Sequence, residues 1–190
     1  MADGRSARPP LQRILVFCGA SMPRKQVYID AARELGFYLA DHGMTLIFGG
    51  SDSGTMKILA DAVLAHGGKV IGVFTSELRS ELLHKGITEA VVTKDLAERK
   101  SRMLAMADAA IALPGSIGTL DELFDAAARK KVRADLCAIP LGLLNTNGYY
   151  DALTAFLRHT AEEGFSKEKD VSMILSAPDP ETLFKLFASA

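Results

Sequence analysis

Short apolar runs that alternate with segments of helical periodicity constrain the fold of this chain more than any other feature. The apolar runs lie at 13–18, 45–50, 69–74, 89–93 and 109–114, with another expected inside 136–144 and a further one at 171–175. Apolar residues recur at helical spacing over about 28–39, 56–66, 95–107, 119–131, 150–163 and 180–188. Strands without polar alternation are covered on both faces, and strands joined by single helices run parallel.

These patterns predict an α/β fold, namely a doubly wound, mostly parallel sheet with helices on both faces, of the Rossmann-like type. Pro140 falls inside the run at 136–144, where it interrupts a strand or marks an edge. A chain of 190 residues is long enough for one domain and short for two. The opening MADGRSARPPLQR lacks the apolar core of a secretory signal. We expect residues 1–12 to be a disordered lead-in and residues 13–190 to form one domain.

Charge and cysteine content exclude several classes of protein. The net charge of −1 provides no basic field that would recruit nucleic acid or an anionic membrane, and no apolar stretch approaches the roughly 20 residues of a membrane span. Cys18 and Cys137 each lie within or at the end of an apolar run, which indicates buried, reduced thiols. The histidines lack metal-ligand spacing. We therefore expect a cytoplasmic protein without a metal site.

Three of the expected strands end in small, turn-forming residues, at 19–21 (GAS), 49–54 (GGSDSG) and 114–119 (PGSIGT). Turns between strand and helix use glycine routinely, but three such loops at one sheet edge favour close approach to a ligand. The third loop opens a helix, so its N–H groups and the helix dipole favour a phosphate. Because neither a Walker A loop nor G-x-G-x-x-G is present, we expect residues 13–190 to bind a mononucleotide or sugar phosphate.

Two charged residues near this loop have both a structural and a functional interpretation. Thr119 and Glu122 have the spacing of a capping box, with threonine at the N-cap and glutamate at N3, and capping alone would explain them. Arg99 shares a helical stripe with Met103 and Met106. A cation on an apolar stripe usually has an anionic partner; the alternative is a solvated helix end whose arginine reaches out to water.

Five segments resemble the Lonely Guy (LOG) family, long labelled lysine decarboxylase-like. They are CGAS (18–21), GGSDSGTM (49–56), ERKSRM (98–103), ADAAIALPGSIGTLDEL (107–123) and GLLNTNGYYDAL (142–153). The resemblance covers roughly residues 13–187. Its most specific element is an Arg-Lys pair upstream of P-G-G-x-G-T-x-x-E. Members of this family hydrolyse the N-glycosidic bond of cytokinin riboside 5′-monophosphates.

The resemblance implies a phosphoribohydrolase that converts a purine nucleoside 5′-monophosphate, cytokinin-type or AMP-like, to free base and ribose 5-phosphate. It assigns catalysis to Arg99 and Glu122. Substrate binding is assigned to Gly19, Ser21, Gly50, Glu81, Lys100, Gly115, Ser116, Ile117, Gly118 and Thr119. Bond cleavage builds positive charge on the ribose, which a fixed carboxylate stabilises, and no cofactor is required. The resemblance and the Ala/Met-rich stretch Met103–Leu113 also suggest a homodimer.

The sequence departs from the family pattern near the predicted site. Ser116 and Ser51 stand where the family has glycines, and a Cβ at 116 would be strained if the backbone there needs positive φ, although the hydroxyl could also donate. Ala128-Arg129 replaces a Thr-Trp pair, followed by Lys130, Lys131 and Arg133, which puts the base pocket in question. Two other interpretations therefore stay open: a non-catalytic nucleotide-binding or sensing module, and a carrier for a larger phosphorylated cofactor.

Overall fold

The computed structural model of the chain describes residues 10–76, 82–133, 136 and 139–189. Its centre is a seven-stranded sheet in the order β4-β3-β2-β1-β5-β6-β7, and every neighbouring pair runs parallel. The strands are β1 (Arg13–Phe17), β2 (Thr45–Phe48), β3 (Lys69–Thr75), β4 (Glu89–Thr93), β5 (Ala109–Ala112), β6 (Leu141–Leu144) and β7 (Ile174–Ala177). The predicted parallel α/β fold is confirmed.

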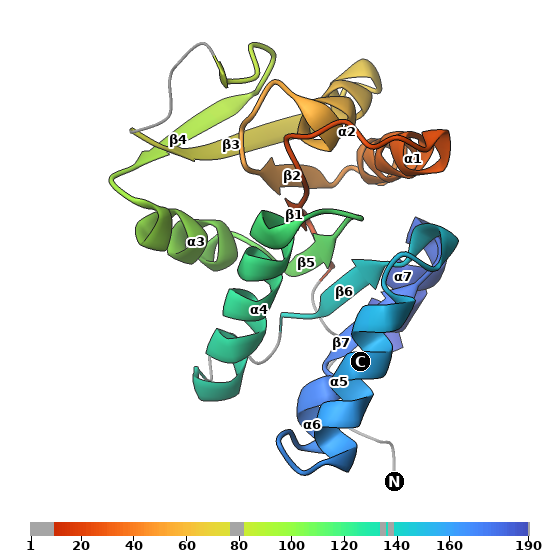
Figure 1. The fold of residues 1–190 in the computed structure, drawn as a ribbon. Helices are drawn as coiled ribbons and strands as arrows, with labels where there is room; N and C mark the ends of the chain where they lie inside the picture. Colours follow the sequence, from red (N-terminus) through yellow and green to blue (C-terminus); the bar gives the residue numbers. More distant parts are fainter. Residues whose placement is uncertain (1–9, 77–81, 134–135, 137–138, 190) are drawn as a thin grey trace, which may run out of the picture.

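Helices cover both faces of this sheet (Figure 1). They are α1 (Gln26–Asp41), α2 (Gly54–Ala65), α3 (Leu96–Ala105), α4 (Ile117–Val132), α5 (Asp151–Glu162), α6 (Glu168–Val171) and α7 (Pro180–Ser189), with a 3₁₀ turn η3 (Thr146–Gly148) before α5. Alternate residues of β1 enter different cores: Ile14 and Val16 pack with α1, α2 and α7, whereas Leu15 and Phe17 pack with α3 and α4. This alternation explains why the strands are apolar throughout.

Strand order places a topological switch point between β1 and β5. From β1 the chain moves outward through β2, β3 and β4, and then returns to the opposite side of β1 to form β5. In open parallel sheets, ligands bind outside the carboxyl ends of the strands at such a point. The loops that begin at Cys18 and Leu113 flank it, and the loop after β2 lies beside them. All three predicted loops therefore share one sheet edge.

Two expectations about the last strands were wrong. Pro140 precedes β6, which lies between β5 and β7 and is not an edge strand. The run at 171–175 is not a strand throughout, because Val171 ends α6 and β7 begins at Ile174. The earlier β-strands follow their apolar runs closely.

Other predictions concern the terminus and the thiols. Residues 1–9 and Cys137 lie outside the described residues, so the disordered lead-in remains a prediction. Gln12 is already held by the fold: its N–H donates to the Asp108 carboxylate at 2.9 Å and its carbonyl accepts from Thr45 at 2.7 Å. Cys18 is buried and free. Across the described ranges no helix is long and apolar enough to cross a membrane.

Most of the stretch that suggested a dimer lies in the interior, although Ala105 and Asp108 are exposed and Met106 is partly buried. Met103 and Leu113 are each only 1% exposed, and the residues of β5 between them are fully buried. Side chains that pack inside their own subunit cannot form a contact between subunits. The buried residues of this stretch therefore give no support to a homodimer, which stays a prediction.

Candidate active site

A buried ion pair connects α3 and α4 at the carboxyl edge of the sheet. Arg99 Nη1 donates to Glu122 Oε1 at 2.7 Å, and the two side chains are 12% and 13% exposed. Arg99 Nε donates to the carbonyl of Val73 on β3 at 2.8 Å, which fixes the guanidinium from a second side. The anionic partner expected for Arg99 is thus Glu122, and the alternative of a solvated helix end is wrong.

Glu122 is not a capping residue. Helix α4 begins at Ile117 with Ser116 as its N-cap, so Thr119 is the third helical residue and Glu122 the sixth. A capping box requires a glutamate three residues after the N-cap, where it can reach back to the cap N–H. The capping interpretation was therefore wrong, and the Glu122 carboxylate is directed to Arg99.

The guanidinium of Arg99 passes directly over Gly49. A Cβ at position 49 would collide with Arg99 Nη2 and would lie 2.9 Å from Met56 Sδ. Sequence reasoning named Gly50, which adopts φ +79° and packs towards Phe74, and it missed Gly49. The repeated glycines were a signal, but the reason for the first depends on a side chain 50 residues further along the chain.

Burial governs protonation in this pair. Burial raises the pKa of Glu122 above its ordinary value, and the opposing influence of the Arg99 charge and hydrogen bond is smaller. Cys18 lines the same cleft, and burial and, secondly, the Glu122 charge raise the pKa of its thiol far above the ordinary range. The thiol is therefore neutral and a poor nucleophile, which leaves Glu122 as the group able to respond to charge in a ligand.

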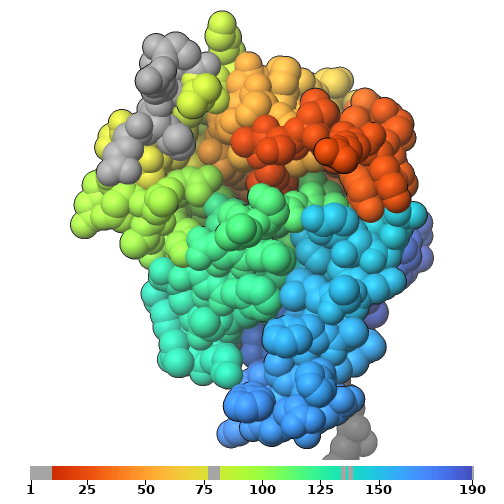
Figure 2. All heavy atoms as spheres, in the orientation of Figure 1, coloured from red at the N-terminus to blue at the C-terminus, as the bar shows by residue number. Residues whose placement is uncertain are grey.

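The pair lines a cleft of about 350 Å³ on the face shown in Figure 2, where α3, α4 and the segment after β1 adjoin. The predicted residues that line it are Gly19, Arg99, Lys100, Ser116, Gly118, Thr119 and Glu122. Sequence reasoning missed others, among them Gly49, Met56 and Asp121.

Of the remaining predicted residues, Ser21 and Gly115 line a neighbouring cleft. Gly50 and Ile117 line neither cleft, and Ile117 is 85% exposed; Glu81 lies outside the described residues.

Lys100 is held by carboxylates of α4. Its Nζ donates to both oxygens of Asp121 at 3.1 Å and lies 3.7 Å from Asp125. Arg129, which replaces a family tryptophan, binds Asp125 at 2.6 Å and donates to Ser101 at 2.8 Å. Residue 129 therefore links α3 to α4, and none of residues 128–133 lines the cleft. The effect of this segment on a base pocket stays a prediction.

The loop between β5 and α4 leaves a polar group without a partner. Thr119 is 2% exposed, and among the described residues its Oγ1 finds no hydrogen-bond partner. A Cβ at Gly115 would press on the Thr119 side chain, whereas one at Gly118 would meet nothing within 4 Å. Ser116 has φ −101°, so no glycine is needed there and the concern about positive φ was wrong. A buried hydroxyl without a partner is costly unless a ligand completes it.

Three helices begin at this edge with uncapped N-termini. The N-cap residues Lys25 (α1), Ser53 (α2) and Ser116 (α4) make no side-chain cap hydrogen bond, and none of these helices has an acidic residue in its first turn. Helix α3 differs, since Asp95 accepts the Glu98 N–H and Glu98 adds a negative charge. In α2 the Met56 N–H already donates to the Gly19 carbonyl at 3.2 Å. The other N–H groups of an uncapped helix start, and its positive dipole end, remain available to an anion.

Two tyrosines after β6 hold this loop. Tyr149 Oη donates to the Gly115 carbonyl at 2.6 Å, and Tyr150 Oη donates to the Leu113 carbonyl at 2.5 Å. They follow Asn147, whose φ of 55° turns the chain back towards the loop. The tyrosine hydroxyls thus bind carbonyl oxygens of the loop and leave its N–H groups to a ligand. Sequence reasoning noticed this segment only through its resemblance.

The two tyrosine hydroxyls should differ in their contribution to stability. Tyr150 is 2% exposed, so Tyr150→Phe leaves the buried Leu113 carbonyl unpaired and should lower the free energy of unfolding by about 1–3 kcal/mol. Tyr149 is 43% exposed, so water can replace its hydroxyl, and Tyr149→Phe should change that free energy by less than about 1 kcal/mol. Urea unfolding of both variants measures the difference, and equal losses would contradict it.

Fold and cleft together define a class: a doubly wound α/β protein with a buried arginine–glutamate pair and uncapped helix starts at its switch point. A family model described as "Possible lysine decarboxylase" matches residues 56–187. A probable cytokinin riboside 5′-monophosphate phosphoribohydrolase of Oryza sativa subsp. japonica is 38% identical over 175 residues, which cover 92% of this chain and 71% of the relative. A cytokinin riboside 5′-monophosphate phosphoribohydrolase of Arabidopsis thaliana is also 38% identical over 175 residues, which cover 92% of this chain and 81% of the relative. The chain belongs to this family, the Lonely Guy (LOG) family.

Solved structures share the fold at lower identity. The molybdenum cofactor binding protein of Rippkaea orientalis superposes with a TM-score of 0.68 at 23% identity, over 97% of this chain and 98% of that one. The molybdenum cofactor carrier protein of Chlamydomonas reinhardtii gives 0.71 at 21% identity, over 94% and 99%. At these identities the likeness describes the architecture alone.

Proposed function

We propose that this chain is a cytoplasmic phosphoribohydrolase that hydrolyses the N-glycosidic bond of a purine nucleoside 5′-monophosphate. The observation that carries the proposal is the buried Arg99–Glu122 pair, which shares one cleft with the uncapped start of α4. Curated relatives at 38% identity are named for this reaction. Glu122 lies about 9 Å along the helix axis from Ser116, as six residues at 1.5 Å rise require, which suits a phosphate at the loop and a ribose near the carboxylate.

In the proposed reaction, the bond between ribose C1′ and the base nitrogen breaks and the base leaves with the electron pair and a proton. Water supplies the oxygen that joins C1′, so the products are free base and ribose 5-phosphate. The ionised form of Glu122, whose carboxylate accepts a hydrogen bond from Arg99, stabilises the positive charge that develops on the ribose or orients the water. Val73 holds Arg99 from the opposite side, which fixes the carboxylate before substrate arrives.

The 5′-phosphate is proposed to bind at the start of α4. The Thr119 hydroxyl, buried and without a partner among the described residues, would donate to it, as would the free N–H groups of the loop. The missing Cβ of Gly118 keeps that approach open. Lys100 is bound to Asp121 and acts by shaping the local charge rather than as a free cation.

We also propose that the chain forms a homodimer, with a contact different from the buried stretch first considered. Leu96, on the rim of the cleft, is 60% exposed, and Ile117 at the start of α4 is 85% exposed. Phe124 on α4 is 37% exposed. Large apolar side chains that gather near a site are typical of an interaction surface, and a second subunit here would shield the pair from water.

An assay with four compounds tests the proposed reaction. Purified protein is incubated with AMP, with N6-isopentenyladenosine monophosphate and with the two matching nucleosides, and free base is measured by chromatography. We expect base release from at least one monophosphate, and a kcat/KM lower by about 100-fold or more for its nucleoside, because charge-assisted phosphate contacts are lost. Binding of monophosphates without release of base would favour the non-catalytic module.

A further inference from the structure

The cleft that contains the ion pair has two walls. Helices α3 and α4 form the first wall, which carries the ion pair itself. The second wall is formed by Gly19 and Ala20 after β1, Gly49 after β2 and Met56 on α2. A nucleotide whose ribose faces the ion pair would lie against this second wall. The position of the second wall therefore decides how much room the proposed substrate has.

A buried threonine at the start of α2 holds the second wall. The Gly19 N–H donates to Thr55 Oγ1 at 3.1 Å, and Thr55 Oγ1 donates to the Gly19 carbonyl at 3.0 Å. The same carbonyl accepts from the Met56 N–H at 3.2 Å. Thr55 is only 3% exposed, and the described residues that line the cleft of the ion pair do not include it. Its hydroxyl therefore acts on this cleft through Gly19.

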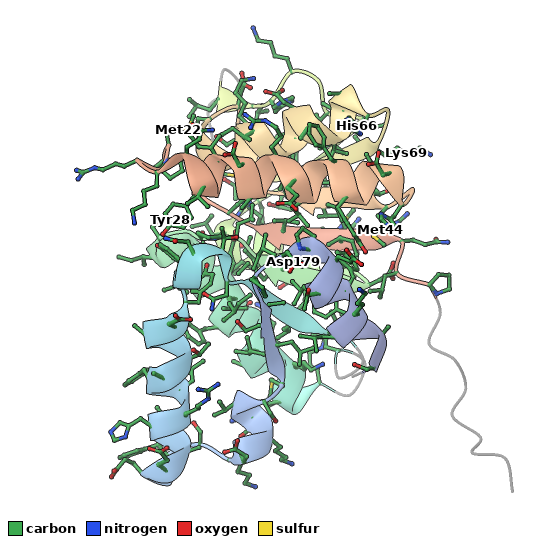
Figure 3. All side chains as sticks on the ribbon, turned by 90° about the vertical axis from the view of Figure 1, so that its right-hand side faces the viewer. Met22, Tyr28, Met44, His66, Lys69 and Asp179 are labelled. Carbon is green, nitrogen blue, oxygen red and sulfur yellow. The ribbon has the colours of Figure 1, made fainter. Side chains whose placement is uncertain are left out.

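The backbones of the two loops are in direct contact beside these hydrogen bonds. Gly54 adopts φ +58°, and a Cβ there would collide with the backbone of Ala20. The first loop continues to Met22, which Figure 3 shows at the end of α1 that lies away from Lys69, the first residue of β3. Because α2 blocks movement on its own side, a loop freed from Thr55 can shift only towards the cleft.

The hydrogen bonds to Thr55 also define what Gly19 can offer to a ligand. The family resemblance assigns Gly19 to substrate binding, yet its N–H and its carbonyl both bind Thr55. Backbone groups that are already paired gain little from a further partner. Gly19 therefore contributes to the cleft through the position of its main chain.

We propose that Thr55 is a positioning residue of the phosphoribohydrolase site, whose hydroxyl holds Gly19 against α2 and so keeps the cleft open for a nucleotide. The inference rests on the proposed function. The second wall lies away from the Glu122 carboxylate and contacts the substrate alike before and during bond cleavage. Its displacement should therefore weaken binding more than it slows the chemical step.

Three variants test the role of the hydroxyl. Thr55→Val keeps the shape of the side chain but removes the hydroxyl, and it should raise KM by about tenfold while kcat stays within about threefold. Thr55→Ser keeps the hydroxyl and should hold KM within about threefold of the unchanged chain. AMP and N6-isopentenyladenosine monophosphate are the nucleotides, and calorimetry measures their dissociation constants alongside KM and kcat.

Thr93→Val is the matched control. Thr93 is 4% exposed, and its Oγ1 donates to the Phe74 carbonyl at 3.1 Å on β4, outside the cleft. It loses the same kind of buried hydrogen bond, so urea unfolding should show a loss of stability similar to that of Thr55→Val. Its KM should nevertheless stay within about threefold of the unchanged chain. If Thr55→Val does not fold, Thr55→Ala takes its place in the comparison.

An unchanged KM in Thr55→Val would overturn the proposal. A rise in KM in Thr55→Ser as large as that in Thr55→Val would also overturn it, because side-chain packing and not the hydroxyl would then be responsible. If neither nucleotide releases base, the proposed function fails, and the dissociation constants decide the role of Thr55 separately. Binding that weakens by about tenfold in Thr55→Val, but in neither Thr55→Ser nor Thr93→Val, would uphold this role. Equal or undetectable binding in all the proteins would overturn it.

Discussion

Glu122→Gln should lower turnover by about 100-fold or more. The amide still accepts the hydrogen bond from Arg99, but it no longer carries the negative charge that stabilises positive charge on the ribose, and loss of one preorganised electrostatic group has this scale. Because Arg99 loses its counter-charge, the free energy of unfolding should fall by about 1–3 kcal/mol. The measurement is the turnover of the variant, after circular dichroism has verified that the variant is folded.

Asp125→Asn is the matched control for Glu122→Gln. It removes a carboxylate from the same helix outside the cleft, where Asp125 binds Arg129 and lies near Lys100. Its turnover should stay within about threefold of the unchanged chain, since no group at the reaction centre is altered. Near-normal turnover of Glu122→Gln would show that Glu122 is only the partner of Arg99, and the sensing module would become the better interpretation.

Arg99→Met should destabilise the protein more than any other single change considered. It leaves the Glu122 carboxylate buried without its partner, and breaking a buried ion pair in this way typically lowers the free energy of unfolding by about 3–5 kcal/mol at neutral pH. Without Arg99, burial raises the pKa of Glu122 further above its unfolded value. The native state then binds more protons than the unfolded state, so stability falls as pH rises between these two pKa values.

Urea unfolding at about pH 4.5 and about pH 7.5 measures this dependence, with the larger loss expected at the higher pH. The double variant Arg99→Met/Glu122→Gln removes both charges and should be more stable than Arg99→Met alone. Its loss of turnover should be less than the product of the two single losses, because the residues act as a unit. An equal deficit at both pH values would contradict a buried, ionisable Glu122.

Sequence patterns predicted most of the sheet because burial on both faces leaves a direct mark on it. The runs at 13–18 and 45–50 had no polar alternation, and each proved to contain a strand with helices above and below. The last strands were displaced because apolar residues there are shared with helix ends: Val171 is apolar but closes α6. Helix starts were also misplaced, since Thr119 and Met56 looked like first residues while the chain had already turned helical at Ile117 and Gly54.

The candidate site divides in the same way. Arg99 was named because it is a cation on an apolar helical stripe, and the family resemblance assigned catalysis to both Arg99 and Glu122. Their mutual distance, and the need for a glycine at 49, arise from packing between elements far apart in the chain. Tyr149 and Tyr150 act on carbonyl groups more than 30 residues away. No local pattern encodes such contacts.

At the uncapped starts of α1, α2 and α4, the proposed binding of an anion conflicts with the stability of the folded chain. A side chain that caps a helix N-terminus adds about 0.5–2 kcal/mol to the free energy of unfolding. These three helices make no such cap hydrogen bond. Set against a net stability of about 5–15 kcal/mol, the deficit is a large one. An anion that binds only the folded chain, as proposed for the substrate phosphate, would recover part of it by mass action. Evolution towards greater heat resistance would thus tend to fill these helix ends with the protein's own carboxylates, and each such gain would weaken the attraction for phosphate.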